Sequence, residues 1–224
     1  MPVSSVLPLD QFFHVYVLTL KGWEDRLERF KDRAAELGVT GYTVLHGVDG
    51  MKIRKPNWWK PNARKYACNL AHMNALHAGI MAGGKPIMIL EDDCYLRDNF
   101  IESVHEVIAF FRDVEWAKVC YLGGRVKRRR GYRAVSRLIY RNVRVTGAYG
   151  YVVSESHAPE VAGYIMNDPG KPRPAYGYFN DIKMRRRAHV ESHVVCRPPA
   201  LGHSGGMSIL QQAHRSGRDV PSPG

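Results

Sequence analysis

Short apolar runs alternate with segments of helical period in the first half of the chain, and this alternation constrains the fold more than any other feature. The run FHVYVLTL at residues 13–20 is rich in Val, Tyr and Phe, which is typical of a strand buried on both faces of a sheet. A segment of helical period follows and ends at Gly38, and YTVLHGV at residues 42–48 is the next apolar run. Strand, helix and strand in this order predict an α/β fold in which a mostly parallel sheet is flanked by helices.

The same criteria apply to the rest of the chain. They predict helices at residues 66–84, 98–111 and 156–166 and strands at residues 86–90, 117–124 and 145–154. The 224 residues are enough for one full core, and no repeat or linker divides the chain. The sequence therefore predicts a single domain over residues 1–214, followed by a disordered tail at residues 215–224.

Three consecutive acids, Glu91, Asp92 and Asp93, directly follow the apolar run PIMIL. Ligands of open α/β sheets bind at the carboxyl ends of strands, and adjacent carboxylates repel one another unless a cation neutralises them. Side chains alternate along extended backbone, so Glu91 and Asp93 can reach the same side and hold Mg²⁺ or Mn²⁺ together with the phosphates of a substrate. The alternative is an exposed acidic turn before the next helix.

The charge of the chain points to an anionic partner. Lys and Arg number 33 against 21 acidic residues, which gives a formal net charge of +12. Residues 125–144 hold nine of these cations and no acid, and they are predicted to form a basic loop. Together with Trp58 and Trp59, such a loop suits nucleic acid, a sugar or an anionic headgroup, and the alternative is a solvated surface loop.

The cysteine spacing, the N-terminal segment and the length of the apolar runs argue against several classes of protein. The four cysteines form no CxxC pair, so neither a zinc knuckle nor a redox motif is indicated. The N-terminus lacks the pattern of a signal peptide, and no apolar stretch is long enough to span a bilayer. We expect a protein of the bacterial or phage-infected host cytoplasm, peripheral to a membrane if it acts on a glycolipid.

Several segments resemble motifs of the family 25 glycosyltransferases, which include lipooligosaccharide and collagen sugar transferases. VYVLTLKGWEDRLERF is similar to the family's first strand and its D-R-x-x-R/x-F helix, and VLHGVDG to its strand that ends in A-x-D-G. ACNLAHMNAL resembles the G-C-x-L-S-H helix, with Ala67 and Ala71 in place of Gly and Ser. MILEDDC resembles the L-E-D-D motif, and GAYGYVVS the G-x-x-A-Y-x-V-S segment, with Gly150 where Ala is usual. The resemblance extends over residues 12–165, and the order of the segments is more specific than any one of them.

The resemblance implies a GT-A fold, a nucleotide-sugar donor (usually a UDP-sugar), Mn²⁺ or Mg²⁺, and inversion at the anomeric carbon. It implies a donor half at about residues 12–124 and an acceptor half at about residues 125–207. Glu91 and Asp93 would then contact the metal, and Glu91 also the donor. The other residues that the resemblance implies for the donor site are Thr19, Arg26, Asp49, Asn69 and His72.

Further candidates follow from the chemistry of inverting transfer. His203, in LGHSGGMS, is a candidate third metal ligand, or else a histidine of a surface loop. Asp181 is a candidate base for the acceptor hydroxyl, although it also suits the start of a helix, and Asp92 or Glu91 are alternatives. Asn69 and His72 lie one helical turn apart and share a face, which suits either sugar hydroxyls or a satisfied core histidine. The candidate acceptor-binding residues are Trp58, Trp59, Arg128, Arg129, Arg130 and Tyr178.

Taken together, the sequence predicts a metal-dependent inverting glycosyltransferase. The positive charge, the small size and the Arg-rich segment favour a hydroxymethylated base of DNA as the acceptor, as in phage DNA modification. The first alternative is a saccharide acceptor in lipopolysaccharide or another lipid-linked surface glycan. The second is a protein that binds nucleic acid without catalysis, and the intact carboxylate triplet argues against it.

Overall fold

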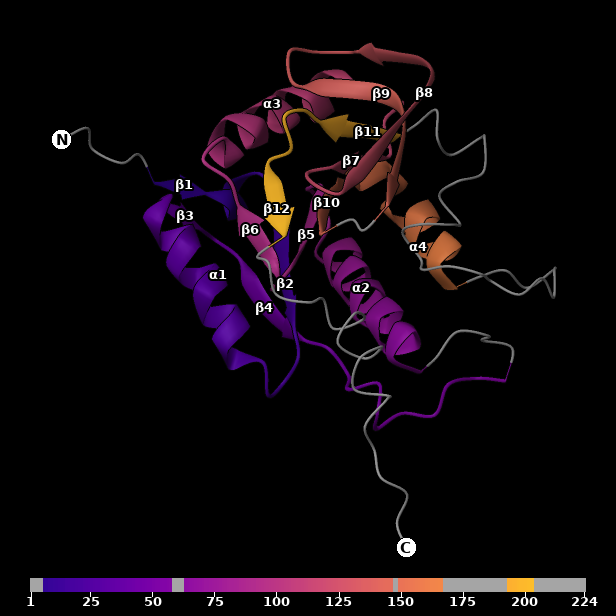
Figure 1. Cartoon of the computed structure of the whole chain (residues 1–224). Helices are drawn as coiled ribbons and strands as arrows, with labels where there is room; N and C mark the ends of the chain where they lie inside the picture. Colours follow the sequence, from indigo (N-terminus) through magenta and orange to yellow (C-terminus); the bar gives the residue numbers. More distant parts are fainter. Residues whose placement is uncertain (1–5, 58–62, 147–148, 167–192, 204–224) are drawn as a thin grey trace, which may run out of the picture.

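The computed structural model describes residues 6–57, 63–146, 149–166 and 193–203 (Figure 1), some of them by backbone alone. The helices of this part are α1 (Glu24–Glu36), α2 (Ala63–Ala82), α3 (Phe100–Asp113) and α4 (Ala158–Met166), with single 3-10 turns at η1 (Leu9–Gln11) and η2 (Glu155–His157). The first strands are β1 (Leu7–Pro8), β2 (His14–Thr19), β3 (Val39–Thr40), β4 (Thr43–His46), β5 (Ile87–Glu91) and β6 (Cys94–Leu96). The later strands are β7 (Val119–Tyr121), β8 (Arg125–Ala134), β9 (Ile139–Thr146), β10 (Gly150–Val153), β11 (His193–Cys196) and β12 (Leu201–His203).

Eight of these strands form one central sheet in the order β4-β2-β5-β10-β7-β11-β9-β8. The β4–β2, β2–β5 and β7–β11 pairs are parallel, whereas β10 and β9 run against their neighbours. Two small sheets, β1–β3 and β6–β12, lie beside the central sheet. The predicted α/β class is confirmed: the sheet is mixed, and among the strands in the described part of the chain β10 and β9 alone oppose the common direction.

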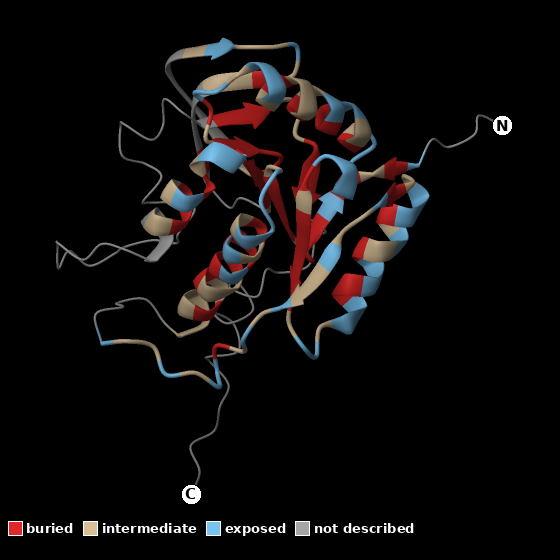
Figure 2. Cartoon of the chain, turned by 180° about the vertical axis from the view of Figure 1, so that it is seen from behind, coloured by how far each residue is buried: buried red, intermediate tan, exposed pale blue. Residues whose placement is uncertain are grey.

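The helices cover both faces of the sheet and complete three layers. One core cluster joins α1 and α3 to one face through residues such as Phe30, Phe100 and Val104. A second cluster joins α2 and α4 to the other face through residues such as Leu76 and Val161. Figure 2 shows the central strands as buried and the outer sides of the helices as exposed. Because β2 and β5 carry apolar side chains on both faces, they can occupy the centre of such a sheet.

The path of the chain reverses between β2 and β5. From β2 the chain passes through α1 to β4 on one side, and it then returns through α2 to β5 on the other side of β2. Ligands of open α/β sheets bind at such a reversal, in the crevice outside the carboxyl ends of the strands. Thr19 ends β2 and Glu91 ends β5, so both residues lie at this edge.

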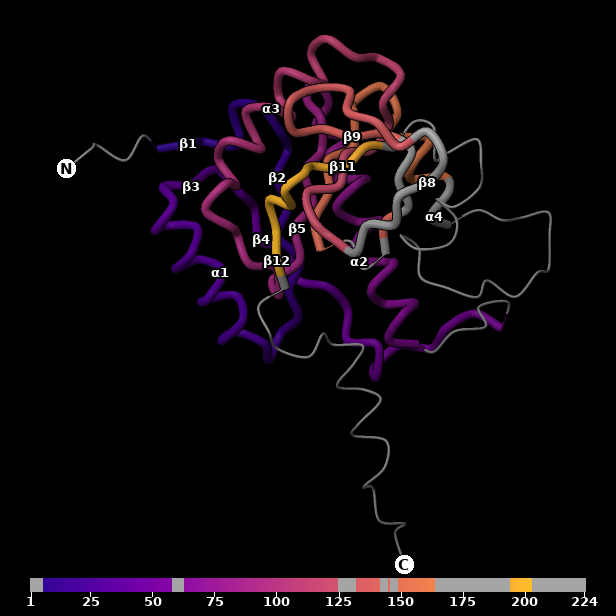
Figure 3. The backbone as a smooth tube through the Cα atoms, turned by 45° about the horizontal axis from the view of Figure 1, so that its top comes forward, coloured from indigo at the N-terminus to yellow at the C-terminus, as the bar shows by residue number. Residues whose placement is uncertain are grey.

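The basic segment at residues 125–144 differs from the predicted loop. It forms the antiparallel hairpin β8–β9 at one end of the central sheet (Figure 3). Val126 pairs with Val145, whose side chain is buried in the second core cluster. Within the segment itself Ile139 is buried in the first core cluster, a contact that the count of charges obscured. None of the helices described is long and apolar enough to cross a membrane.

Candidate functional site

The three consecutive acids lie at the carboxyl end of β5 and in the turn that leads to β6. Glu91 is the last residue of β5, and Asp92 and Asp93 form the turn before Cys94. Backbone hydrogen bonds fix this turn: the Asp92 N–H donates to Leu18 O at 3.0 Å, and the Glu91 N–H donates to Tyr149 O at 2.9 Å. Asp92 and Asp93 are buried, whereas Glu91 is half-buried. The acids therefore do not form the exposed turn that was the alternative from the sequence.

Arg26 of α1 binds two of the three acids. Its Nη2 lies 2.5 Å from Asp92 Oδ1 and 2.9 Å from Asp93 Oδ2. The guanidinium also lies over the ring of Trp23, 5.1 Å from the ring centre. Nε and Nη1 of Arg26 are buried and have no hydrogen-bond partner among the residues described. Arg26 is thus the cation that makes the burial of two adjacent carboxylates possible, and it has donors left over.

Asp92 is engaged on both oxygens. Oδ1 accepts the Arg26 hydrogen bond, and Oδ2 accepts a hydrogen bond of 2.7 Å from Thr19 Oγ1. The carboxylate is buried, with a side-chain exposure of 2%. This arrangement favours Asp92 as the residue that orients Arg26, because a general base must reach the proton that it removes. Thr19 and Arg26, both predicted near the donor, are therefore brought together by Asp92.

Glu91 faces α2 instead of Arg26. Its Oε1 lies 3.4 Å from His72 Nε2, and the other ring nitrogen of His72, Nδ1, lies 3.0 Å from the hydroxyl of Tyr151. The rings of His72 and Tyr151 are stacked, with centres 5.7 Å apart. Cys68 lies one turn before His72 on α2, and one ligand atom from each of Cys68, His72 and Glu91 lies within 4.8 Å of the others. A mixed set of sulfur, nitrogen and oxygen ligands thus adjoins the acids.

The negative charges at this edge are only partly compensated. Burial and the charge of Glu91 raise the pKa of Asp93 to about 7, and Arg26 limits the rise. Burial also raises the pKa of Asp92, against the opposing effects of Arg26 and Thr19. The pKa of the Cys68 thiol is raised by burial and by the charges of Glu91 and Asp93. Three carboxylates with one guanidinium leave two formal negative charges, which is the charge that a divalent cation neutralises.

Glu91 and Asp93 offer carboxylate oxygens of the kind that Mg²⁺ and Mn²⁺ prefer, and Glu91 is partly accessible. Glu91 lies toward His72, whereas Asp93 lies toward Arg26. His203, the predicted third ligand, belongs to β12, and its backbone pairs with that of Cys94, next to Asp93. The side chain of His203 lies outside the described part. The backbone alone therefore brings a residue 110 positions away beside the acids.

The other predicted residues are placed as follows. Asn69 is buried on α2, between Cys68 and His72 in the sequence. Asp49 follows β4 at the same edge of the sheet, and its Oδ1 accepts a hydrogen bond of 2.9 Å from the Met51 N–H, which closes a turn. Of Arg128, Arg129 and Arg130 the structure describes the backbone, within β8. The predicted residues that lie outside the described part are Trp58, Trp59, Tyr178 and Asp181.

Two residues of the site, Cys68 and Tyr151, were missed from the sequence. The sequence assigned Cys68 no role, although its spacing of four from His72 on a helix was a usable signal for a shared face. Tyr151 belongs to β10, a strand flanked by β5 and β7, and an apolar strand pattern gives no indication that its hydroxyl has a polar partner. Only the pairing of β10 with β5 brings Tyr151 near His72.

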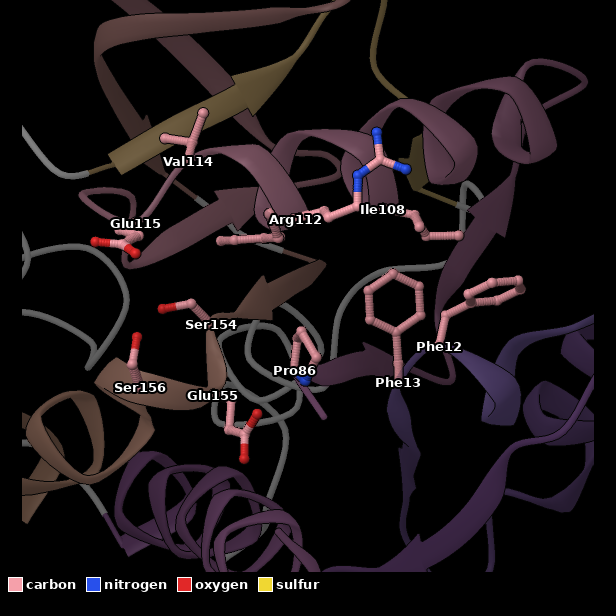
Figure 4. A pocket seen from close by; sticks show the side chains of 11 residues that line it. Phe12, Phe13, Pro86, Ile108, Arg112, Val114, Glu115, Ser154, Glu155 and Ser156 are labelled. Carbon is pink, nitrogen blue, oxygen red and sulfur yellow. The ribbon is translucent and has the colours of Figure 1, made fainter. Parts of the chain in front are cut away.

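A separate cavity lies at the opposite edge of the sheet (Figure 4) and has a volume of about 330 Å³. Residues that precede β2, β5 and β7 line it, among them Phe13, Pro86 and Val114. Arg112 and Glu155 add charge at its border. Because the acids lie at the carboxyl ends of the same strands, this cavity does not belong to the site described above.

Comparison with known proteins gives no information about function, so the proposed function rests on the geometry of the site. No protein-family model and no curated protein matches the chain. The observations that bear on function are therefore the acids at the reversal between β2 and β5, Arg26, and the mixed ligands on α2.

Proposed function

We propose that the protein is a metal-dependent inverting glycosyltransferase that uses a nucleotide-sugar donor, with a UDP-sugar as the first candidate. The observation that carries the proposal is the placement of Glu91, Asp92 and Asp93 outside the carboxyl ends of β2 and β5. A nucleoside diphosphate is anionic, so it can share this edge with the acids only if a cation lies between them. Mn²⁺ or Mg²⁺ on Glu91 and Asp93 would provide that cation, and a GT-A fold is part of the proposal.

The side chains have distinct roles in this proposal. Asp92 and Thr19 hold Arg26, and Arg26 holds Asp93 in a fixed orientation. Glu91 and Asp93 would hold the ion, which when bound supplies positive charge opposite the diphosphate leaving group. The unused donors of Arg26 suit a phosphate oxygen. Asp181 remains the first candidate for the base that accepts the proton of the acceptor hydroxyl, and Glu91 is the second.

A donor panel tests this proposal. Purified protein is incubated with common UDP-, GDP- and dTDP-sugars and Mn²⁺ or Mg²⁺, and both hydrolysis and transfer are measured by mass spectrometry. We expect metal-dependent turnover of one donor and a loss of about 100-fold or more in Asp93→Asn, because a preorganised charge at the reacting centre is removed. A matched control is Asp98→Asn, since Asp98 is an exposed partner of Arg33. Full activity of Asp93→Asn, or no turnover of any donor, would refute the proposal.

The basic hairpin favours DNA as the acceptor. In the register of β8 and β9, Arg133 lies opposite Arg141. Like charges that face each other across an antiparallel pair destabilise it, unless an anion binds there. A DNA backbone supplies a row of phosphates along such a strand, whereas a short neutral saccharide does not. The hydroxymethylated base in DNA is therefore the proposed acceptor, and the lipid-linked glycan is its alternative.

The acceptor is distinguished by binding and by transfer. Hydroxymethylated duplex DNA and a lipooligosaccharide core are compared as acceptors with the donor found above. Transfer to DNA alone supports the proposed acceptor, and transfer to the glycan alone refutes it. DNA binding without transfer of any sugar would instead favour the non-catalytic alternative.

A further inference from the structure

The face of α2 that lies toward the sheet offers sulfur and nitrogen ligands, whereas the acids offer only oxygen. Cys68 and His72 are four residues apart on this helix, and both approach Glu91 at the end of β5. A Cys, a His and a carboxylate form the set that zinc-class ions prefer, because thiolate and imidazole are softer ligands than the oxygens that Mg²⁺ requires. The structure thus joins α2 to β5 through three groups that can share one ion.

The distances suit a tetrahedral ion. Nitrogen and oxygen ligands at about 2.0–2.2 Å from a zinc ion lie about 3.4 Å from each other in tetrahedral geometry. The separation between His72 Nε2 and Glu91 Oε1 is 3.4 Å. The ligand atom of Cys68 lies within 4.8 Å of both, so a side-chain adjustment of about 1 Å closes the set.

The orientation of the imidazole is independently fixed. Tyr151 contacts Nδ1 of His72 at 3.0 Å and stacks on the ring, which leaves Nε2 directed at Glu91. Metal-binding histidines commonly have such a partner on the second ring nitrogen, which sets the tautomer and the ring orientation. Both His72 and Tyr151 are buried, so the arrangement is held by packing.

We propose that Cys68, His72 and Glu91 form a binding site for a zinc-class divalent ion, with a fourth position open. The ion would link the helix α2 to the carboxyl end of β5. The site shares Glu91 with the proposed donor site, but the proposal does not depend on sugar transfer.

Cobalt spectroscopy of the full-length protein tests the site without donor or acceptor. Metal-free protein is titrated with Co²⁺, a tetrahedral substitute for Zn²⁺, and thiolate-to-cobalt absorption is recorded. The other three cysteines, Cys94, Cys120 and Cys196, are buried, and Cys68→Ser assigns the band to Cys68. We expect one tightly bound ion per chain, displaced by Zn²⁺, and a thiolate band that is absent in Cys68→Ser.

Variants of the histidine and its partner complete the experiment. We expect His72→Gln to lose at least about tenfold in Co²⁺ affinity, and Tyr151→Phe to lose about 10- to 100-fold. His77→Gln is the matched control, because His77 is exposed on the same helix. Circular dichroism confirms that each variant is folded. Absence of a thiolate band in the wild-type protein, or unchanged affinity in His72→Gln, would overturn the proposal.

The result separates this proposal from the proposed function. Both Co²⁺ binding and sugar transfer can depend on Glu91, so Glu91→Gln does not distinguish them. A thiolate band in a protein that turns over no donor supports the metal site and refutes the transferase. Mn²⁺-dependent sugar transfer by a protein without a thiolate band supports the transferase and refutes the metal site at Cys68, His72 and Glu91.

Discussion

The ion pair between Arg26 and Asp93 does not fully offset the cost of burying the Asp93 carboxylate. Arg26 contacts both Asp92 and Asp93, yet the pKa of Asp93 remains raised to about 7 because the carboxyl group is buried and faces Glu91. A raised pKa means that the folded state prefers the protonated carboxyl. Side chains that lower stability in this manner are common at functional sites.

A pH dependence of stability follows from Asp93. Its pKa is about 7 in the folded protein and 3.8 ordinarily, so between these values the folded state holds a proton that the unfolded state has lost. Stability contributed by this group is therefore complete below about pH 4 and falls as the pH rises to about 7. Asp93→Asn removes the effect. Urea unfolding in EDTA should show the wild-type protein losing stability relative to Asp93→Asn between pH 4 and pH 7, by an amount on the order of a few kcal/mol. A constant difference between the two proteins would contradict this cause.

Removal of Arg26 should have a larger effect than removal of either acid. Arg26→Met keeps much of the side-chain volume but leaves Asp92 and Asp93 buried without their cation. We expect a loss of about 3–5 kcal/mol in the free energy of unfolding at pH 8, measured by urea denaturation. Arg33→Met is the control, since Arg33 on the same helix pairs with Glu36 and Asp98, whose side chains are exposed. An equal loss in both variants would mean that the acids at the sheet edge do not depend on Arg26.

At the residue level, the sequence predicted that the three acids form part of the site, but it did not predict that Arg26 binds two of them. Glu91 to Asp93 were recognisable because a buried strand leads directly into them. The contact of Arg26 with Asp92 joins residues 66 positions apart, and no local pattern specifies it. Tyr151 was missed for the same reason, since it comes near His72 only when β10 pairs beside β5. Cys68 differs, because its spacing from His72 on one helix was a local signal.

At the level of elements, β12 is positioned by glycine. A Cβ atom at Gly123 would lie 2.8 Å from Leu201 Cβ and 2.9 Å from Leu201 O. The backbone N–H groups of Ala200 and Leu201 both donate to Leu122 O, so this segment cannot easily move away. The end of β7 therefore accepts β12 only because residue 123 has no side chain.

Gly123→Ala tests this close approach. We expect a loss of about 1–3 kcal/mol in stability, because the added methyl group overpacks a hydrogen-bonded backbone. Gly163→Ala is a suitable comparison, since Gly163 lies within α4 and an added Cβ would meet nothing within 4 Å. That substitution should stabilise the protein by up to about 1 kcal/mol through helix propensity. The stability of both variants is measured by thermal unfolding. Equal destabilisation of the two would contradict the steric explanation.

The helices and central strands were largely predictable at this level, whereas the hairpin was not. Amphipathic periodicity in α1 and α3 and apolar runs in β2 and β5 are local properties of the sequence. The segment at residues 125–144 has a strand pattern that is obscured by nine cations, and its β structure is stabilised by pairing with β11, which lies some 50 residues later. Pairing of distant strands is a tertiary property that a local pattern does not contain.

At the level of the whole molecule, charge is unevenly distributed. The net charge is +12, yet the edge at β5 has three acids against Arg26. The cations of β8 and β9 lie at the far end of the same sheet. An extended polyanion can therefore bind along the hairpin without repulsion from the acids.

The dependence of DNA affinity on salt concentration tests whether DNA contacts this hairpin. If DNA phosphates contact it, log affinity should fall linearly with log salt, by about 0.9 for each phosphate contact. Replacing Lys127, Arg129 and Arg133 with Gln should lower the slope by about two to three. Lys31, Lys52 and Lys85, replaced in the same way, serve as a charge-matched control outside the hairpin. Filter binding or fluorescence anisotropy over a salt series gives the slopes, and equal slopes for the two triple variants would exclude the hairpin as the contact.

The position of β11 determines the order in which the molecule can be completed during synthesis. This strand lies between β7 and β9, so the hairpin β8–β9 has no place in the sheet until residues 193–196 have left the ribosome. The same late segment supplies β12, which pairs with β6 directly after the acids. Until residues 193–203 are available, β9 therefore lacks its β11 neighbour and β6 lacks its β12 neighbour. One segment late in the sequence thus completes both the far end of the central sheet and the small sheet beside the acids.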